Sequence, residues 1–256
     1  MSALRNIYHD FFLVWTFFTR IPAPNFSTQR SLVQALWTLP VLAVLLGSAQ
    51  ASVYFIFRPL LSNQDSSFLT VILAIFLVVT PIKLTGALHW DGLADLADGM
   101  GVPKNRRMEV MRDPKIGTFG VLSLVIAFSV QLAALSHLIN VLDSSEIVIC
   151  FIAVSLLSRQ TMIVAWSNAN EEGANAKTAK GRPSRRSALI VWLLIFFTVA
   201  VSGFVSGLAL LALVGFLVGI LAFNQMFLPE MSGDAIGATQ IFTETFLFIM
   251  IAIIYV

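Results

Sequence analysis

Long runs of apolar residues, separated by short polar segments, constrain the fold of this chain more than any other feature. A bilayer core of about 30 Å needs about 20 apolar residues in each helix that crosses it. Runs long enough for a span lie, in chain order, at about 34–57, 67–88, 117–139, 146–167, 188–205, 207–228 and 240–256. The sequence therefore predicts an all-α, polytopic transmembrane helical bundle of about seven spans, forming one integral membrane domain over residues 1–256.

Composition favours the same class of protein. Of the residues, 57% are hydrophobic and 12% are charged, whereas a soluble domain carries about 25% charged residues. The formal net charge of +2 does not suggest a nucleic-acid partner. The single cysteine, Cys150, lies in an apolar run and cannot form an internal disulfide, and no Cys/His cluster with zinc spacing occurs.

The basic residues between the spans predict how the chain sits in the membrane. Loops that carry lysine and arginine tend to stay in the cytoplasm. A cytoplasmic N-terminus places nearly all of these residues inside, whereas the outward loops hold only Arg58. The polar segments that then face the cytoplasm are 1–33, 89–115, 168–187 and 229–239. We expect the C-terminus outside and the working face of the protein inside.

The segment from His89 to Gly99 carries three carboxylates at helical spacing. Asp91, Asp95 and Asp98 are separated by four and three residues, which places them on one face of a helix. Carboxylate oxygens are suitable ligands for Mg²⁺, which also binds substrate phosphates. Such a face could instead be a solvated acidic surface. Its position beside a membrane span, where ionisable residues tend to be functional, favours a metal site.

His89 directly precedes the three aspartates, and three roles suit it. It could accept a proton from an attacking hydroxyl group. It could equally donate a hydrogen bond to a substrate, or simply form the polar end of the second span. The residue pattern leaves these alternatives open.

A basic segment follows the acidic one, and it suggests phosphate chemistry. Cations neutralise the charge that develops on a transferred phosphoryl group and on its leaving group. Lys115 and the backbone of Gly117, at the start of the next predicted helix, could bind a phosphate. Anchoring of the membrane boundary explains Lys115 equally well. Asp113 could join the metal site or form a salt bridge with Arg112.

Ionisable residues inside the apolar runs predict a second side of the site. Arg159 lies deep in its span, and we expect it to bind an anion or to pair with an acid. Glu244 lies in the last apolar run, with Gln240 one turn before it on the same face. A carboxylate there should face a polar cavity, a metal or a cation. Asp234 is placed to cap the last helix, which alone would account for it.

In these segments the chain resembles the cobalamin synthase family, the adenosylcobinamide-GDP ribazoletransferases. The resemblance spreads over nearly the whole chain in the order of the family's motifs. The matching residues are Phe18 to Pro22 with Pro24, His89 to Gly99, Asp113 with Ile116 to Gly120, Ser158 and Arg159, and Gly233, Asp234, Gly237, Ala238 and Glu244. One stretch, 167–173, departs from the aromatic and basic pattern that the family often has there.

The resemblance implies a specific reaction and place. Enzymes of this family lie in the bacterial inner membrane, require Mg²⁺, and join adenosylcobinamide-GDP to α-ribazole or its 5′-phosphate with release of GMP. The product is adenosylcobalamin or its 5′-phosphate. The roles that follow are metal binding by Asp91, Asp95 and Asp98, completion of the site or positioning of the nucleophile by Asp113, Asp234 and Glu244, and phosphate binding by Lys115 and Arg159.

Two other functions fit parts of the pattern. A CDP-alcohol phosphotransferase needs Ala-Arg shortly after its first Asp-Gly, but here Ala94 is followed by Asp95. A transporter with ion-coupling carboxylates needs acids near the bilayer midplane, and only Glu244 is predicted there. The sequence leaves open the lower-ligand base, the phosphorylation of the acceptor, and whether the chain forms a homo-oligomer.

Overall fold

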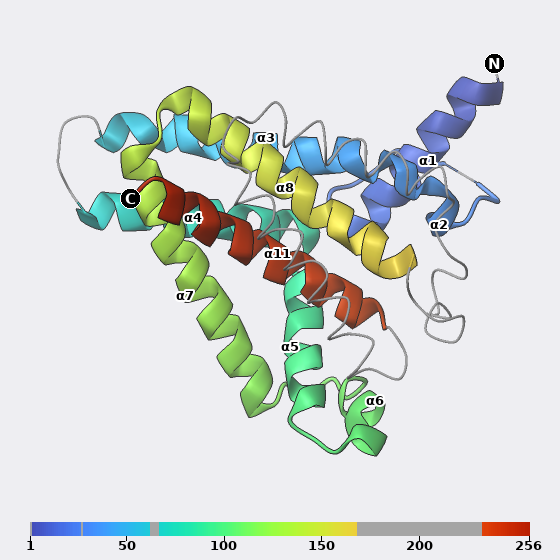
Figure 1. The fold of residues 1–256 in the computed structure, drawn as a ribbon. Coiled ribbons are helices and arrows are strands. Elements are labelled where there is room, and N and C mark those ends of the chain that lie inside the picture. The colour runs from blue at the N-terminus through green and yellow to red at the C-terminus, as the bar shows by residue number, and fades with distance from the viewer. Residues whose placement is uncertain (1, 27, 62–66, 168–231) are drawn as a thin grey trace.

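The membrane-spanning helices dominate the part of the chain that the structure describes. The structure is a computed structural model, and it describes residues 2–26, 28–61, 67–167 and 232–256. Within these ranges every element is a helix (Figure 1). Five helical segments are long and apolar enough to cross a membrane, namely Leu32–Phe57, Ser67–Thr85, Thr118–Val141, Ser144–Ser167 and Gly233–Ile254. They confirm five of the predicted spans; the two predicted at about 188–205 and 207–228 lie outside the described residues.

Short helices connect the long ones. The helices, in chain order, are α1 (Ser2–Phe18), α2 (Leu32–Ala35), η1 (Leu36–Thr38), α3 (Leu39–Phe57), η2 (Arg58–Leu61), α4 (Ser67–Thr85), α5 (Leu88–Met100), η3 (Lys104–Arg106), α6 (Arg107–Val110), α7 (Thr118–Val141), α8 (Ser144–Ser167) and α11 (Gly233–Ile254). The first span is continuous through α2, η1 and α3. A capping box between Ser31 and Gln34 starts it.

The last helix begins earlier than the apolar run predicted. The helix α11 starts at Gly233, so its first two turns occupy a stretch expected to be a polar turn. Its N-cap is Ser232, whose hydroxyl oxygen accepts a hydrogen bond from the Ala235 amide at 3.2 Å. The predicted cap, Asp234, therefore lies inside the first turn, where a negative charge interacts favourably with the helix dipole.

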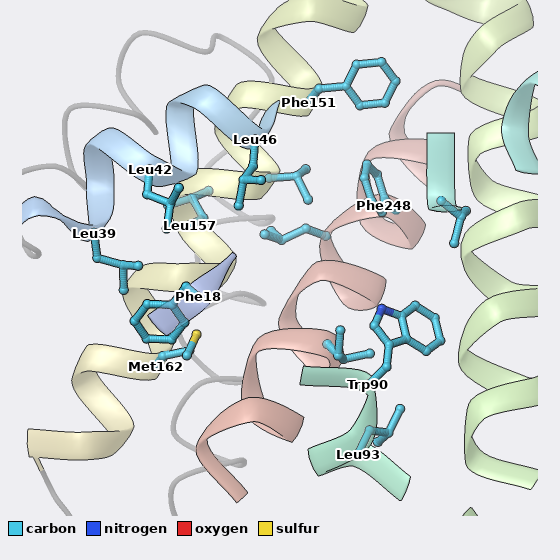
Figure 2. Packing of buried hydrophobic residues seen from close by; sticks show 14 of the residues in the cluster. Phe18, Leu39, Leu42, Leu46, Trp90, Leu93, Phe151, Leu157, Met162 and Phe248 are labelled. Carbon is cyan, nitrogen blue, oxygen red and sulfur yellow. The ribbon is translucent and has the colours of Figure 1, made fainter. Parts of the chain in front are cut away.

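Three close helix pairs organise the described part of the bundle. The helix α3 packs along α8, and α11 packs against both α5 and α8. Apolar side chains from these helices fill the space between them, and Phe18 of α1 reaches the same core (Figure 2). The helix α8 is thus surrounded, whereas α7 is the least buried of the five spans. Such a helix exposes its apolar side chains to lipid in a membrane.

The ends of the helices agree with the predicted alternation of sides. The end of α3, the start of α4 and the C-terminus gather at one end of the bundle, and α1 lies toward the other (Figure 1). A common end for these three points is what alternate crossing requires. Which end faces the cytoplasm remains a prediction from the basic residues.

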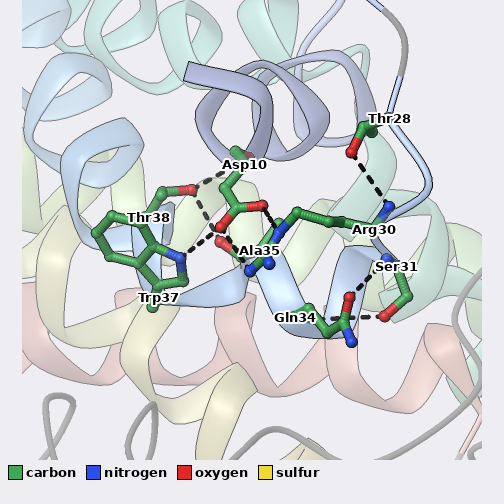
Figure 3. Close-up of polar contacts among 8 residues, drawn as sticks. All are labelled: Asp10, Thr28, Arg30, Ser31, Gln34, Ala35, Trp37 and Thr38. Atoms are coloured by element: carbon green, nitrogen blue, oxygen red, sulfur yellow. Dashed lines mark hydrogen bonds and ion pairs between the residues drawn. The ribbon is translucent and has the colours of Figure 1, made fainter. Parts of the chain in front are cut away.

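A buried carboxylate ties the N-terminal helix to the first span. Asp10 in α1 is 1% exposed. Its side chain accepts hydrogen bonds from Arg30 at 2.5 and 2.9 Å and from the Trp37 indole at 2.8 Å (Figure 3). A bidentate guanidinium pair with a further donor satisfies a buried carboxylate well. This contact holds α1 against the start of the first span. It explains why Asp10, for which no role was predicted, is a carboxylate.

We predict that Gly47→Ala destabilises the bundle. A Cβ atom on Gly47 would lie 2.7 Å from the Phe151 carbonyl oxygen and 2.8 Å from the Ile152 Cα, so α3 and α8 would have to separate. Overpacking of this kind costs about 1–3 kcal/mol. The measurement is the thermal unfolding midpoint of the purified protein in detergent.

Gly233→Ala is the matched control, because no atom lies within 4 Å of the added Cβ. Its unfolding midpoint should equal that of the unmodified protein. An equal loss in both variants would show that the approach of α3 to α8 does not determine the effect, because Gly→Ala by itself favours a helix.

Candidate active site

A left-handed turn directs the acidic helix away from the second span. Gly86 and Ala87 have φ values of +64° and +61°, and α5 starts directly after them. Only glycine adopts this conformation without strain, so Ala87 is an unusual residue there. The side chain of Arg20 lies against Gly86, and the Arg20 amide donates a hydrogen bond to the Leu84 carbonyl oxygen at 2.8 Å. The N-terminal motif thus supports the turn that aims α5.

The helices α5 and α11 cross at two glycines. A Cβ atom on Gly92 would lie 2.6 Å from the carbonyl oxygen of Asp234, and one on Gly237 would lie 3.3 Å from the His89 Cα. Small residues let helix backbones approach this closely. The crossing brings Asp234, which is distant in sequence, beside the aspartates of α5.

The carboxylates at this crossing repel one another. Burial, together with the charges of Asp91, Asp234 and Asp98, raises the pKa of Asp95 to about 6. Asp91 is exposed and Asp95 is half-buried. In the ranges that the structure describes, no three His, Cys, Asp or Glu side chains form a ready metal centre. Neighbouring acids that disfavour their own ionisation form a site that a cation would stabilise.

Asp98 has a partner of its own. Its two carboxylate oxygens accept hydrogen bonds from the Gly117 amide at 2.6 Å and the Gly120 amide at 2.8 Å. These amides lie at the start of α7, so Asp98 caps that helix from α5. The Gly117 amide, predicted to bind a phosphate, is therefore engaged by Asp98. The acidic motif and the Ile-Gly-Thr-Phe-Gly motif are parts of one contact.

His89 lies where four helices meet. Its ring centroid is 5.8 Å from that of Phe18 in α1. The pKa of His89 is lowered to about 3, chiefly by burial and also by the charge of Arg159 in α8. A contact with the Gln240 side chain in α11 partly opposes this lowering. The imidazole is therefore neutral at physiological pH. A pKa near 3 makes it a poor general base and leaves it suited to hydrogen bonding.

A polar seam joins α8 and α11 beside His89. The Thr161 and Thr243 hydroxyls are 3.1 Å apart, and the Gln240 amide donates to the Ser158 hydroxyl at 3.2 Å. The same amide donates to Glu244, the residue one turn further along α11. Hydrogen bonds of this kind between helices stabilise polar side chains inside a membrane.

The hydrogen bonds of Arg159 stay within its own helix. Its Nη1 donates to the Ser155 carbonyl oxygen at 3.1 Å and to the Ser155 hydroxyl at 2.9 Å. The residue is 3% exposed, and among the described residues no carboxylate forms an ion pair with it. Glu244 attracts it from beyond ion-pair distance. The structure thus brings Arg159, Gln240 and Glu244 near His89.

Asp113 and Lys115 are not drawn into this arrangement by any hydrogen bond or ion pair in the described part of the chain. Both are exposed, and the Asp113 carboxylate accepts a hydrogen bond from the Lys115 amide at 3.0 Å within a local turn. The alternative ion pair between Asp113 and Arg112 is not formed among the described residues. Their predicted roles in metal and phosphate binding stay predictions.

Sequence reasoning missed the neutral polar residues of the seam. The hydroxyls concerned belong to Ser155, Thr161, Thr239 and Thr243, all buried. A signal was present, because polar residues recur at intervals of three and four along two otherwise apolar helices. That spacing predicts a polar stripe on one face of each helix.

Comparison with known proteins places these motifs in a family. A family profile described as Cobalamin-5-phosphate synthase matches residues 10–252. The chain belongs to the cobalamin-5-phosphate synthase family. The predicted class, a transferase of cobalamin biosynthesis, is thereby confirmed, and the membrane helices agree with it.

Curated relatives support the assignment across the whole chain. A protein of Sinorhizobium medicae (strain WSM419) is 31% identical over 260 residues, covering 95% of this chain and 96% of the relative. One from Shewanella woodyi (strain ATCC 51908 / MS32) is 29% identical and covers 98% of both. Each is named adenosylcobinamide-GDP ribazoletransferase. No solved structure shows a significant match.

We predict that Asp98→Ala in this family member loosens the start of α7. The change removes the acceptor of two amides, and loss of hydrogen bonds to a buried charged group costs about 1–3 kcal/mol. Hydrogen exchange at Gly117 and Gly120 should become faster, and Asp98→Asn should give an intermediate rate because it keeps one acceptor oxygen. Asp113→Ala, which removes only a local turn contact, should leave both rates unchanged.

We also predict that Asp95→Asn stabilises the metal-free protein at neutral pH. The folded-state pKa of about 6 lies above the ordinary value of 3.8, so ionised Asp95 disfavours the folded state above about pH 6. The neutral amide removes this effect. The gain in unfolding midpoint, measured with EDTA, should shrink as the pH falls below about 6 and vanish below the ordinary pKa of 3.8, where Asp95 is protonated in both states.

Glu109→Gln is the control for this pH series, because Glu109 is exposed and pairs only with Arg106. Its unfolding midpoint should follow that of the unmodified protein at every pH. A gain from Asp95→Asn that persists unchanged to low pH would contradict the electrostatic explanation.

Proposed function

We propose that this chain transfers the adenosylcobinamide-phosphate group of adenosylcobinamide-GDP to α-ribazole or α-ribazole 5′-phosphate, with release of GMP. The observation that carries the proposal is the crossing of α5 and α11, where Asp91, Asp95 and Asp234 lie beside buried His89 and Gln240. Curated relatives that bear the name of this activity cover nearly the whole chain. The site thus combines an acidic part suited to a cation with a neutral polar part.

The proposed reaction is a displacement at phosphorus. A ribose hydroxyl oxygen of the acceptor forms a bond to the phosphorus that carries cobinamide, and the bond from that phosphorus to the oxygen of the leaving GMP breaks. The hydroxyl proton passes to the oxygen of the leaving GMP or to the solvent, so that atoms and charge balance. Because the 5′-phosphorylated acceptor gives a 5′-phosphorylated product, the attacking group is a hydroxyl of the ribose ring and not the 5′ oxygen.

The acidic side chains at the crossing suit Mg²⁺, although the described residues contain no preformed group of three metal-binding side chains. Mg²⁺ typically binds one or two carboxylates together with substrate phosphates. Asp91 and Asp95, with Asp234 opposite them, would hold it; Asp98, also predicted as a ligand, already accepts two amide hydrogen bonds. The bound ion would withdraw charge from the diphosphate.

The remaining residues would bind and orient the substrates. Arg159 is a buried cation without a direct carboxylate partner among the described residues, which suits phosphate or another electron-rich group. Neutral His89 would form a hydrogen bond to a substrate hydroxyl. Glu244 and Gln240 would hold this arrangement through their mutual hydrogen bond.

The proposed location is the bacterial inner membrane, with the site facing the cytoplasm. The support is the predicted excess of basic residues on that side and the five helices able to span a bilayer. Nucleotide substrates are present on the cytoplasmic side, so this orientation would give them access.

The test is product formation by membranes that contain the protein, supplied with adenosylcobinamide-GDP and α-ribazole, with and without Mg²⁺. We expect product and an equal amount of GMP only with the metal. Asp91→Asn, Asp95→Asn and Asp234→Asn should each reduce the rate at least about 100-fold, because each removes a carboxylate that would hold the metal against the diphosphate.

Glu109→Gln is again the control, and its rate should match that of the unmodified protein. Absence of product with both α-ribazole and its 5′-phosphate, from protein shown to be folded, would refute the proposed function. Product formed equally well without divalent metal would refute the role of the acidic crossing alone.

A further inference from the structure

The polar side chains beside the acidic crossing leave hydrogen-bonding atoms unused. We use the term polar cluster for His89, Ser158, Arg159, Gln240 and Glu244. The Gln240 side chain lies close enough to His89 to influence it, but within the described part of the chain neither His89 Nε2 nor Gln240 Oε1, both buried, has a hydrogen bond of ordinary geometry. His89 is 4% exposed and Gln240 is 1% exposed. An unpaired polar atom costs about 1–3 kcal/mol in such a place, so these two atoms indicate that a ligand completes the cluster.

The charges of the polar cluster nearly cancel. It contains one guanidinium, Arg159, and one carboxylate, Glu244, which attract each other without a direct ion pair. Of the other members, Ser158 and Gln240 are uncharged side chains. A phosphate group would be attracted by Arg159 but repelled by Glu244, so the cluster suits an uncharged ligand with several hydroxyl groups.

The unused atoms also match hydroxyl groups in kind. The Gln240 Oε1 atom is an acceptor, so its partner must be a donor. A neutral imidazole nitrogen can accept or donate, according to its tautomer. A pair of neighbouring hydroxyls can satisfy both atoms, because each hydroxyl both donates and accepts.

The position of the polar cluster fits the attacking end of the acceptor. His89 lies two residues before Asp91 in α5, and Gln240 lies in α11, the helix that brings Asp234 to the same crossing. We propose that the polar cluster binds the ribose ring of the acceptor nucleoside, with Gln240 Oε1 accepting a hydrogen bond from one ring hydroxyl and His89 Nε2 bonding to the other. This inference rests on the proposed function, whose donor diphosphate would lie at the adjacent carboxylates.

The test measures binding separately from turnover. The purified full chain in lipid nanodiscs is titrated by calorimetry with α-ribazole, with its 5′-phosphate, and with analogues that lack one ring hydroxyl. We expect Gln240→Leu to weaken α-ribazole about tenfold and the 5′-phosphate by the same factor. One deoxy analogue should bind the unmodified protein about tenfold more weakly than α-ribazole does. Gln240→Leu should bind this analogue and α-ribazole equally, because the variant lacks the group that the missing hydroxyl would contact. Binding of adenosylcobinamide-GDP should not change.

Gln131→Leu is the matched control. Gln131 is another buried glutamine in a membrane helix, and its amide bonds to Thr245 at 2.9 Å. This variant should bind both acceptors normally. Thermal unfolding in the same nanodiscs shows whether each variant is folded, and Gln240→Met, of similar volume, replaces Gln240→Leu if the latter unfolds.

The outcomes separate the two proposals. Normal acceptor binding by folded Gln240→Leu, in a protein that forms product, would overturn the ribose site and leave the proposed function standing. Weakened binding of the donor alone would assign the cluster to the donor and also overturn the inference. Failure of the unmodified protein to bind either acceptor or to form product would overturn both proposals.

Discussion

The close approach of α5 and α11 is the contact on which the candidate site depends. At Gly92 the two helices come so near that no side chain fits between them, and at Gly237 the second helix passes beside the backbone of His89. This approach brings Asp234 to the aspartates of α5 and Gln240 to the histidine. A single crossing therefore assembles two neighbouring environments, one acidic and one neutral and polar.

The membrane setting explains why the polar residues lie in a continuous seam. A polar group inside a bilayer must find its partners within the protein. On α8 and α11 hydroxyls and amides therefore face one another, as Thr161 and Thr243 do. The buried contact of Asp10 with Arg30 and Trp37 follows the same rule at the membrane boundary. Among the buried atoms of the described residues that lack a partner, those of His89 and Gln240 lie beside the acidic crossing and are therefore informative about ligands.

The sequence predicted the features that depend on local spacing and missed those that depend on distant contacts. Apolar length predicted the five described spans, and the interval between Asp91 and Asp95 predicted a shared helix face. The contact of Asp98 with Gly117 and Gly120 crosses 19 and 22 residues, and no periodicity predicts it. The early start of α11 was missed because its first turns are polar, although Ser232 is a typical cap. The contacts between the family motifs, such as that of Asp98 with Gly117, can be seen only in the structure.

The contact between Asp98 and α7 has a mechanical consequence. Of the five spans, α7 is the least buried, so its tilt responds most directly to the thickness of the surrounding bilayer. Its first turn is fastened to the carboxylate of Asp98, three residues along α5 from Asp95. A change in tilt would therefore pull on the helix that carries the acidic residues. Through this contact, the lipid composition of the membrane would influence the positions of the acidic residues on α5.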